Sequence, residues 1–184
     1  MTKARKILIT GGVRSGKSRF ALFLTREFAQ QKIFIATAQP FDPEIKKRIE
    51  GHQKERGESF STLEEPLYLS KAMDSLPPNG VAVIDCLTLW LNNLLFHFKG
   101  NENRVTEQID LLINSLEASL STVIVITNET GWGIIPTNKI SRQFIEKMGL
   151  INQRIAANSD EVILLVAGLP YWMKGKKNDQ SLSR

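Results

Sequence analysis

The stretch that most constrains this chain of 184 residues is the octapeptide Gly-Gly-Val-Arg-Ser-Gly-Lys-Ser at positions 11–18. Gly11 and the triplet at 16–18 enclose four residues, which is the spacing G-x-x-x-x-G-K-[ST]. An apolar run at 7–9 enters the motif as a buried strand does, and residues 20–24 leave it with the pattern of a helix. The motif together with this strand, loop and helix context predicts a phosphate-binding loop.

The expected chemistry of this loop follows from its backbone. In a glycine-rich turn, successive N–H groups converge on phosphate oxygens, and the helix that follows directs its positive end at the same charge. Lys17 is expected to reach the β- and γ-phosphates, and the Ser18 hydroxyl is expected to help hold Mg²⁺. Arg14 is expected to help neutralise phosphate charge. The chain is therefore predicted to bind a nucleoside triphosphate.

The fold class follows from the distribution of apolar runs along the chain. Helical stretches separate these runs, and no hairpin signal joins them, which predicts an α/β fold with a mostly parallel sheet and helices on both faces. We expect one nucleotide-binding domain over residues 1–170 and a flexible C-terminal tail over 171–184. The five runs are residues 7–9, 33–36, 81–85, 123–126 and 162–166.

Asp85 ends the third of these runs and is the predicted metal partner. A carboxylate at the end of a strand, following a phosphate-binding loop, is the Walker B arrangement that orients Mg²⁺ through water. The alternative is an aspartate that caps the apolar helix expected at 87–98. That helix is apolar nearly all round, so we expect it to be buried in the core or against another subunit.

The histidine at position 52 falls in a mostly polar helix predicted for residues 43–55. Ile45, Ile49 and His52 share one face of that helix, so the imidazole is expected to face the protein. Spacing alone favours a structural histidine bonded to a backbone group over a reactive one. Both interpretations stay open on spacing.

Composition excludes several classes of protein. The single cysteine, Cys86, excludes an internal disulfide, and the ligands of a structural zinc site are missing. No apolar run has the length of a membrane span, and we expect a cytoplasmic protein without membrane insertion. The net charge of +5 is spread along the chain apart from Lys174, Lys176 and Lys177, so we expect no nucleic-acid partner.

Several segments together resemble one family, the adenosylcobinamide kinase/adenosylcobinamide-phosphate guanylyltransferases of cobalamin biosynthesis. The phosphate-binding loop alone is unspecific, whereas the segments around His52 and after residue 126 are specific in combination. The resemblance runs from about residue 7 to 168 in one order. The segments are GGVRSGKS at 11–18, IATAQ at 35–39, RIEGHQKER at 48–56, TNETGWGIIP at 127–136 and NQRIAANSDEVILLVAG at 152–168.

The resemblance implies two reactions and a covalent intermediate. Members of the family phosphorylate the hydroxyl of adenosylcobinamide with ATP or GTP. They then transfer GMP from GTP to adenosylcobinamide phosphate through a guanylylated histidine, releasing pyrophosphate. By this resemblance His52 becomes the expected nucleophile, and neutral imidazole suits such a transfer. Because Gly51 stands where relatives can have another histidine, His52 is the only candidate there.

The resemblance also implies a RecA-like P-loop core, a homotrimer and a set of site residues. The predicted catalytic residues are His52 and Lys17, and the predicted metal residues are Ser18 and Asp85. Some relatives are expected to have Glu in place of Asp85. The predicted nucleotide-binding residues are Gly11, Gly12, Val13, Arg14, Ser15, Gly16, Lys17, Ser18, Ala36, Thr37, Ala38, Gln53, Lys54, Glu55, Arg56, Glu64 and Asp85.

Two other functions compete with this one. A P-loop kinase of a small metabolite or nucleoside would share the phosphate-binding loop and lack the guanylyl step. A GTP-operated switch usually reads guanine through N-K-x-D, and the nearest string here, Asn138-Lys139-Ile140-Ser141, lacks the aspartate. Trp132, Tyr171 and Trp172 are candidates to pack against a corrinoid, and each is equally suited to the core or an interface.

Overall fold

The computed structural model describes residues 4–28, 30–39 and 59–175. Its centre is a seven-stranded sheet in the order β3-β2-β4-β5-β1-β6-β7, in which every neighbouring pair is parallel except β6 and β7. The prediction of a mostly parallel sheet is confirmed. The strands are β1 (Lys6–Gly11), β2 (Lys32–Ala36), β3 (Phe60–Glu64), β4 (Val81–Asp85), β5 (Thr122–Ile126), β6 (Glu161–Val166) and β7 (Leu169–Lys174).

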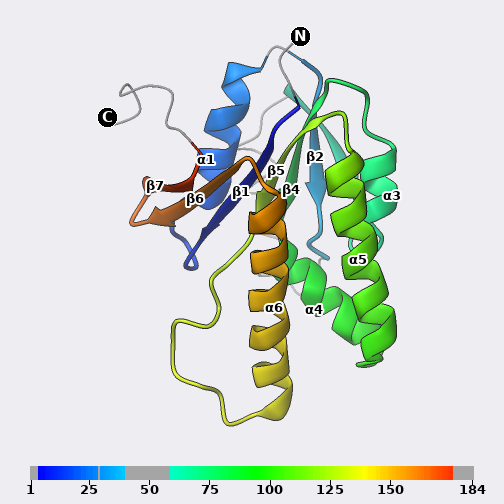
Figure 1. Cartoon of the computed structure of the whole chain (residues 1–184), viewed down its shortest axis with the longest axis vertical. Helices are drawn as coiled ribbons and strands as arrows, with labels where there is room; N and C mark the ends of the chain where they lie inside the picture. The colour runs from blue at the N-terminus through cyan, green and yellow to red at the C-terminus, as the bar shows by residue number, and fades with distance from the viewer. Residues whose placement is uncertain (1–3, 29, 40–58, 176–184) are drawn as a thin grey trace.

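Helices cover both faces of this sheet, as predicted. α1 packs on one face, and α3 to α6 pack on the other (Figure 1). The predicted helix at 43–55 lies outside the described residues. The described helices are α1 (Lys17–Leu24), the 3-10 turn η1 (Thr25–Glu27), α3 (Leu69–Asp74), α4 (Leu87–His97), α5 (Glu102–Ala118) and α6 (Lys139–Asn158).

Alternation along the central strands divides the core into two layers. In β1, Ile7 and Ile9 face α1, whereas Leu8 faces the layer of four helices. All three side chains are at most 1% exposed, so the strand is buried on both faces, as a continuous apolar run requires. The apolar helix α4 uses Trp90, the largest of its core side chains, inside the second layer. The prediction that α4 is buried is confirmed for its core face, while Phe96 at its end is 82% exposed.

Two edge strands were not predicted from the sequence. β3 pairs with β2, although four of its five side chains are exposed, because its backbone completes the hydrogen bonding of β2. β7 returns antiparallel to β6 and tolerates Pro170 because it is an edge strand. The prediction that a flexible tail begins at residue 171 is therefore wrong for residues 171–174, which belong to β7.

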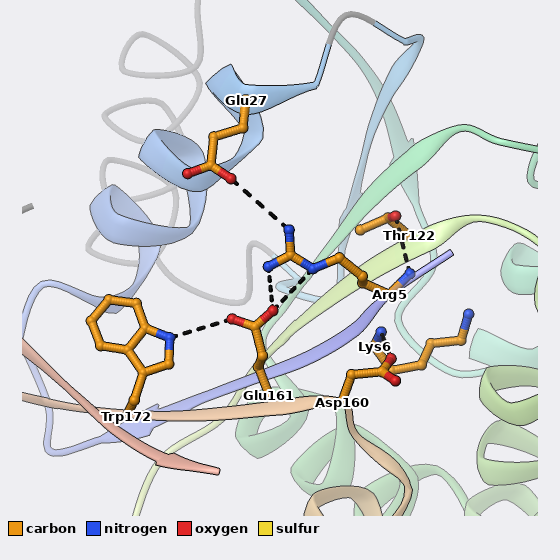
Figure 2. Close-up of polar contacts among 7 residues, drawn as sticks. All are labelled: Arg5, Lys6, Glu27, Thr122, Asp160, Glu161 and Trp172. Carbon is orange, nitrogen blue, oxygen red and sulfur yellow. Dashed lines mark hydrogen bonds and ion pairs between the residues drawn. The ribbon is translucent and has the colours of Figure 1, made fainter. Parts of the chain in front are cut away.

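A polar cluster closes the amino end of the sheet (Figure 2). The Glu161 carboxylate of β6 accepts hydrogen bonds from the Arg5 guanidinium and, at 3.3 Å, from Trp172 Nε1. Glu27 Oε2 lies 3.9 Å from the same guanidinium. The edge of the Trp172 ring meets Phe20 of α1. Through Trp172, this cluster fixes β7 against the helix that follows the phosphate-binding motif.

In the described part of the chain, no helix is both long enough and apolar enough to cross a bilayer.

Candidate active site

The predicted phosphate-binding loop joins β1 to α1 at the carboxyl end of the sheet. Gly11 has φ of 143°, and a Cβ atom there would stand 2.3 Å from the Leu165 carbonyl oxygen of β6, so only glycine fits. Gly16 has φ of 97° and precedes the first helical residue, Lys17. From the turn between β6 and β7, Gly168 N donates to Ser15 O at 3.0 Å. The β6–β7 hairpin therefore supports the loop from outside.

Lys17 points back across the loop that precedes it. Its Nζ donates to the Gly12 carbonyl oxygen at 2.6 Å and to the Gly11 carbonyl oxygen at 3.1 Å. The side chain belongs to the first turn of α1 and is only 7% exposed in total. In this motif the lysine reaches the β- and γ-phosphates, and the Lys17 ammonium is held against the loop that would bind them.

Ser18 of α1 and Asp85 at the end of β4 are in contact. Ser18 Oγ donates to Asp85 Oδ2 at 3.0 Å, although the two residues are 67 positions apart in sequence. A hydroxyl and a carboxylate side by side are the hard oxygen donors that suit Mg²⁺ when substrate phosphates and water complete its coordination. The pair fits the predicted metal role, and bound there Mg²⁺ would neutralise charge on the phosphate oxygens.

Thr37 lies beneath Asp85 and is fully buried. Its N–H donates to the Asp85 carbonyl oxygen at 3.1 Å, and its Oγ1 accepts from Cys86 N at 2.9 Å. Asn93 Nδ2 of α4 donates to the Thr37 carbonyl oxygen at 2.8 Å. Through these hydrogen bonds, Thr37 holds the end of β4 in place. Direct contact between Thr37 and a nucleotide stays a prediction.

Cys86, next to Asp85, has a thiol held in its neutral form. Burial is the main cause that raises the pKa of Cys86 to about 11, and the neighbouring Asp85 carboxylate adds to the effect. A neutral thiol is a poor nucleophile, so the side chain acts as a small apolar group at the site.

A second polar group was not predicted, and it centres on Glu129 just after β5. Glu129 Oε1 accepts from Thr10 Oγ1 at 2.6 Å and from Asn152 Nδ2 of α6 at 3.3 Å. Glu129 N donates to the Gly11 carbonyl oxygen at 3.3 Å, the same oxygen that accepts from Lys17 Nζ. A carboxylate thus lies against the base of the phosphate-binding loop.

Neighbouring polar residues hold the end of β5 in place. Thr127 Oγ1 donates to Asn152 Oδ1 at 2.8 Å, and Asn128 Nδ2 donates to Thr88 Oγ1 of α4 at 2.8 Å. The sequence offered one signal for this group: a Thr-Asn-Glu triplet directly follows a buried strand, and parallel strands bring their carboxyl ends to one edge.

The loop after this triplet runs along α6 and projects past the carboxyl edge of the sheet (Figure 1). Gly131 approaches Ile145 of α6, and Arg142 Nη1 donates to the Pro136 carbonyl oxygen at 3.0 Å. Trp132, a candidate for corrinoid packing, is 70% exposed on this loop. Tyr171 is also exposed, whereas Trp172 is partly buried and packs against Phe20 of α1.

The structure brings together those predicted site residues that it describes. Asp85 ends β4, and Ala36 ends the adjacent strand β2 opposite Asp85. Ala38 follows β2 and is half-buried, and Glu64 is exposed at the end of β3, opposite Ala36. All lie at the carboxyl edge with the loop at 11–18. Predicted residues outside the described part are His52, Gln53, Lys54, Glu55 and Arg56.

A family model described as "Cobinamide kinase / cobinamide phosphate guanyltransferase" matches residues 7–173, which is most of the chain. This chain belongs to that family. Two bacterial relatives of the cobinamide kinase/guanyltransferase family align over nearly their whole length. The bifunctional adenosylcobalamin biosynthesis protein CobP of Pseudomonas aeruginosa is 39% identical over 170 residues, covering 92% of this chain and 97% of the relative. The protein of the same description named CobU from Escherichia coli is 36% identical over 175 residues, covering 89% and 96%.

Solved structures show the same core in more distant proteins. The RadB recombinase superimposes with a TM-score of 0.53 at 14% identity, over 88% of this chain and 74% of that one. The type III secretion ATPase EscN of enteropathogenic E. coli gives 0.54 at 13% identity, over 89% of this chain and 42% of that one. These similarities confirm the predicted RecA-like P-loop fold.

Proposed function

We propose that this chain is a bifunctional enzyme of cobalamin nucleotide-loop assembly. It phosphorylates the hydroxyl of adenosylcobinamide with ATP or GTP. It then transfers GMP from GTP to adenosylcobinamide phosphate, which gives adenosylcobinamide-GDP and pyrophosphate. The reactions require a bound triphosphate whose charge is neutralised and whose reacting phosphorus is held in line with the attacking group.

The observation that supports this proposal most strongly is the convergence of Lys17, Ser18 and Asp85 at the phosphate-binding loop. The Lys17 ammonium donates to carbonyl oxygens of the loop, and Ser18 Oγ, on the next residue, donates to Asp85 Oδ2 at 3.0 Å. Together they offer a cation for the phosphate oxygens and oxygen donors for Mg²⁺. Family membership then narrows the acceptor of the phosphoryl group from any metabolite to a cobinamide.

The guanylyl step is assigned to His52. Its support is the resemblance of the segment at 48–56 to the family, together with the chemistry of imidazole. In the first half, His52 forms a bond to the α-phosphorus of GTP, the bond from that phosphorus to the α–β bridging oxygen breaks, and pyrophosphate leaves. In the second half, a phosphate oxygen of adenosylcobinamide phosphate displaces the imidazole. Gln53, Lys54, Glu55, Arg56 and Glu64 are proposed to contact the guanine nucleotide.

Labelled GTP tests the covalent intermediate. The chain is incubated with Mg²⁺ and GTP labelled at the α-phosphate, and the label on the protein is measured after acid and after base. We expect a label that survives base and is lost in acid, and that is absent from His52→Ala. The variant His97→Ala is the matched control, because it removes the other histidine of the chain.

Two results would contradict this assignment. Label that persists in His52→Ala would move the intermediate to another residue. A wild-type chain that phosphorylates cobinamide without ever acquiring label would leave the alternative, a P-loop kinase without the guanylyl step.

The proposal extends to assembly and compartment. By family resemblance we propose a homotrimer that works in the cytoplasm. Light scattering coupled to size-exclusion chromatography tests the assembly, and a mass equal to one chain of 20.7 kDa would contradict it.

A further inference from the structure

Glu129 is a carboxylate beside a site that binds a highly negative ligand, and this position calls for an explanation. Its backbone N–H and the Lys17 ammonium both donate to the Gly11 carbonyl oxygen, at 3.3 and 3.1 Å. Negative charge next to the phosphates weakens nucleotide binding by like-charge repulsion unless it has another task. Residues that serve only to bind phosphate are cations and N–H donors.

The hydrogen bonds of Glu129 orient its side chain through neutral partners. Oε1 accepts from two neutral groups, the Thr10 hydroxyl at 2.6 Å and the Asn152 amide at 3.3 Å. Among the described residues, no lysine or arginine forms an ion pair with Glu129, and no donor is bonded to its Oε2. The side chain is only partly buried. One oxygen is thus fixed to the scaffold, and within the described part of the chain the other carries no hydrogen bond.

Glu161, at the amino end of the sheet, is an example of a carboxylate with a structural role in this molecule (Figure 2). Both of its oxygens are used: Oε1 by the Arg5 guanidinium and Oε2 by Trp172 Nε1. Its charge is compensated by a cation, whereas the described side chains that donate to Glu129 are both neutral. The difference favours a chemical role for Glu129.

We propose that Glu129 is the general base of the phosphoryl-transfer step, an inference that rests on the proposed kinase function. The acceptor is the alcohol group of the cobinamide. Its oxygen forms a bond to the γ-phosphorus, and its proton passes to Glu129 Oε2. The bond from the γ-phosphorus to the β–γ bridging oxygen breaks, and the nucleoside diphosphate leaves with that electron pair. The proton then passes from Glu129 to water.

The two half-reactions differ in their need for such a base. An alcohol must lose a proton as it attacks, whereas the phosphate group that accepts GMP is already an anion and needs no base. Self-guanylylation uses the imidazole as nucleophile and likewise places no demand on Glu129. The role of Glu129 is therefore confined to the kinase half.

The variant Glu129→Gln tests this role because it retains an oxygen acceptor for Thr10 and Asn152 but cannot take a proton. Removing a general base lowers kcat for phosphorylation by about 10²- to 10⁴-fold. Affinity for a non-hydrolysable triphosphate should be unchanged or tighter, because a negative charge is lost. Self-guanylylation by labelled GTP should stay within about threefold of wild type, since this step loses no general base. Glu129→Asp keeps a carboxylate and should recover at least about tenfold of the lost rate.

Glu161→Gln is the matched control, since it changes a partly buried, hydrogen-bonded carboxylate far from the loop at 11–18. It should lower thermal stability without separating the two activities. The proposal is overturned if Glu129→Gln retains phosphorylation within about tenfold of wild type. It is also overturned if both activities fall equally, or if Glu129→Asp is no faster than Glu129→Gln.

The wild-type chain separates this test from that of the proposed function. A wild-type protein that guanylylates itself but never phosphorylates cobinamide would refute the kinase half, and the role of Glu129 with it. A wild-type protein active in both reactions, with Glu129→Gln active in both, would refute the role of Glu129 alone.

Discussion

The two ends of the sheet carry similar side chains in different settings. At the amino end, Arg5 is bonded to Glu161, and Lys6 N donates to the Asp160 carboxylate at 2.7 Å. Arg5 and Glu161 thus form an ion pair, whereas the Asp160 carboxylate accepts from a backbone N–H. At the carboxyl end, Lys17 bonds to carbonyl oxygens, Asp85 accepts from a serine hydroxyl, and Glu129 accepts from a threonine and an asparagine.

This difference teaches which charges serve the fold and which serve a ligand. At the amino end, the Arg5–Glu161 ion pair and the bond from Lys6 N to Asp160 join the start of β1 to the start of β6, and Trp172 adds β7. At the carboxyl end, hydrogen bonds to neighbouring groups orient Lys17, Asp85 and Glu129, and charges oriented in advance act on whatever binds there. A lysine pair and an aspartate pair, each with one residue at each end, and two glutamates of the amino end allow the comparison to be tested.

The lysine pair should give the largest effect. Lys17→Met removes the cation from the phosphate site, so both activities should fall by about 10²- to 10³-fold or more, measured as initial rates at saturating nucleotide. Lys6→Met is the control, because Lys6 Nζ also donates to two carbonyl oxygens, of Ser119 and Ser121. Burial lowers the pKa of Lys6, and the charge of Asp160 acts against that shift. Equal losses of activity in the two variants would break the comparison.

The aspartate pair tests the metal role of the carboxyl end. Asp85→Asn keeps a group that can bond to Ser18 but loses the negative charge, so the Mg²⁺ concentration giving half-maximal rate should rise by about 10- to 100-fold. Asp160→Asn changes the partner of Lys6 N and should leave the Mg²⁺ requirement as in wild type. An unchanged requirement in Asp85→Asn would refute the assigned metal site.

The glutamates of the amino end should show the smallest effect, and one on stability alone. Glu161→Gln leaves the Arg5 guanidinium without its charged acceptor and should reduce the free energy of unfolding in urea by about 1–3 kcal/mol. Glu27→Gln is the control, because its carboxylate is 52% exposed and 3.9 Å from Arg5; exposed pairs contribute about 0–1 kcal/mol. Equal losses of unfolding free energy in the two variants would show that Glu161 does not stabilise the amino end of the sheet more than Glu27 does.

The elements that could be predicted from the sequence are those whose conformation depends on residues close together in the chain. Runs of Ile and Val predicted the five central strands because burial on both faces demands apolar residues. The spacing around Lys17 predicted the phosphate-binding loop because the conformation depends on residues within it. β3 and β7 were not predicted, because edge strands are held by backbone hydrogen bonds to a neighbouring strand and their side chains need not be apolar.

The polar group around Glu129 was not predicted for a different reason. Thr10 and Glu129 are 119 positions apart, and their contact depends on the register of β1 and β5 and on the position of α6. No pattern within one segment records such a contact. The assignment of His52 came from resemblance alone, since periodicity favoured a structural histidine.

Product analysis is the most direct test of the central claim, which is that the carboxyl end of this sheet transfers two different groups to a cobinamide. Purified chain is incubated with adenosylcobinamide, GTP and Mg²⁺, and corrinoids are resolved by mass spectrometry over time. Adenosylcobinamide phosphate should appear first and then decline as adenosylcobinamide-GDP and pyrophosphate accumulate. Unchanged adenosylcobinamide in the presence of both nucleotide and metal would contradict the claim.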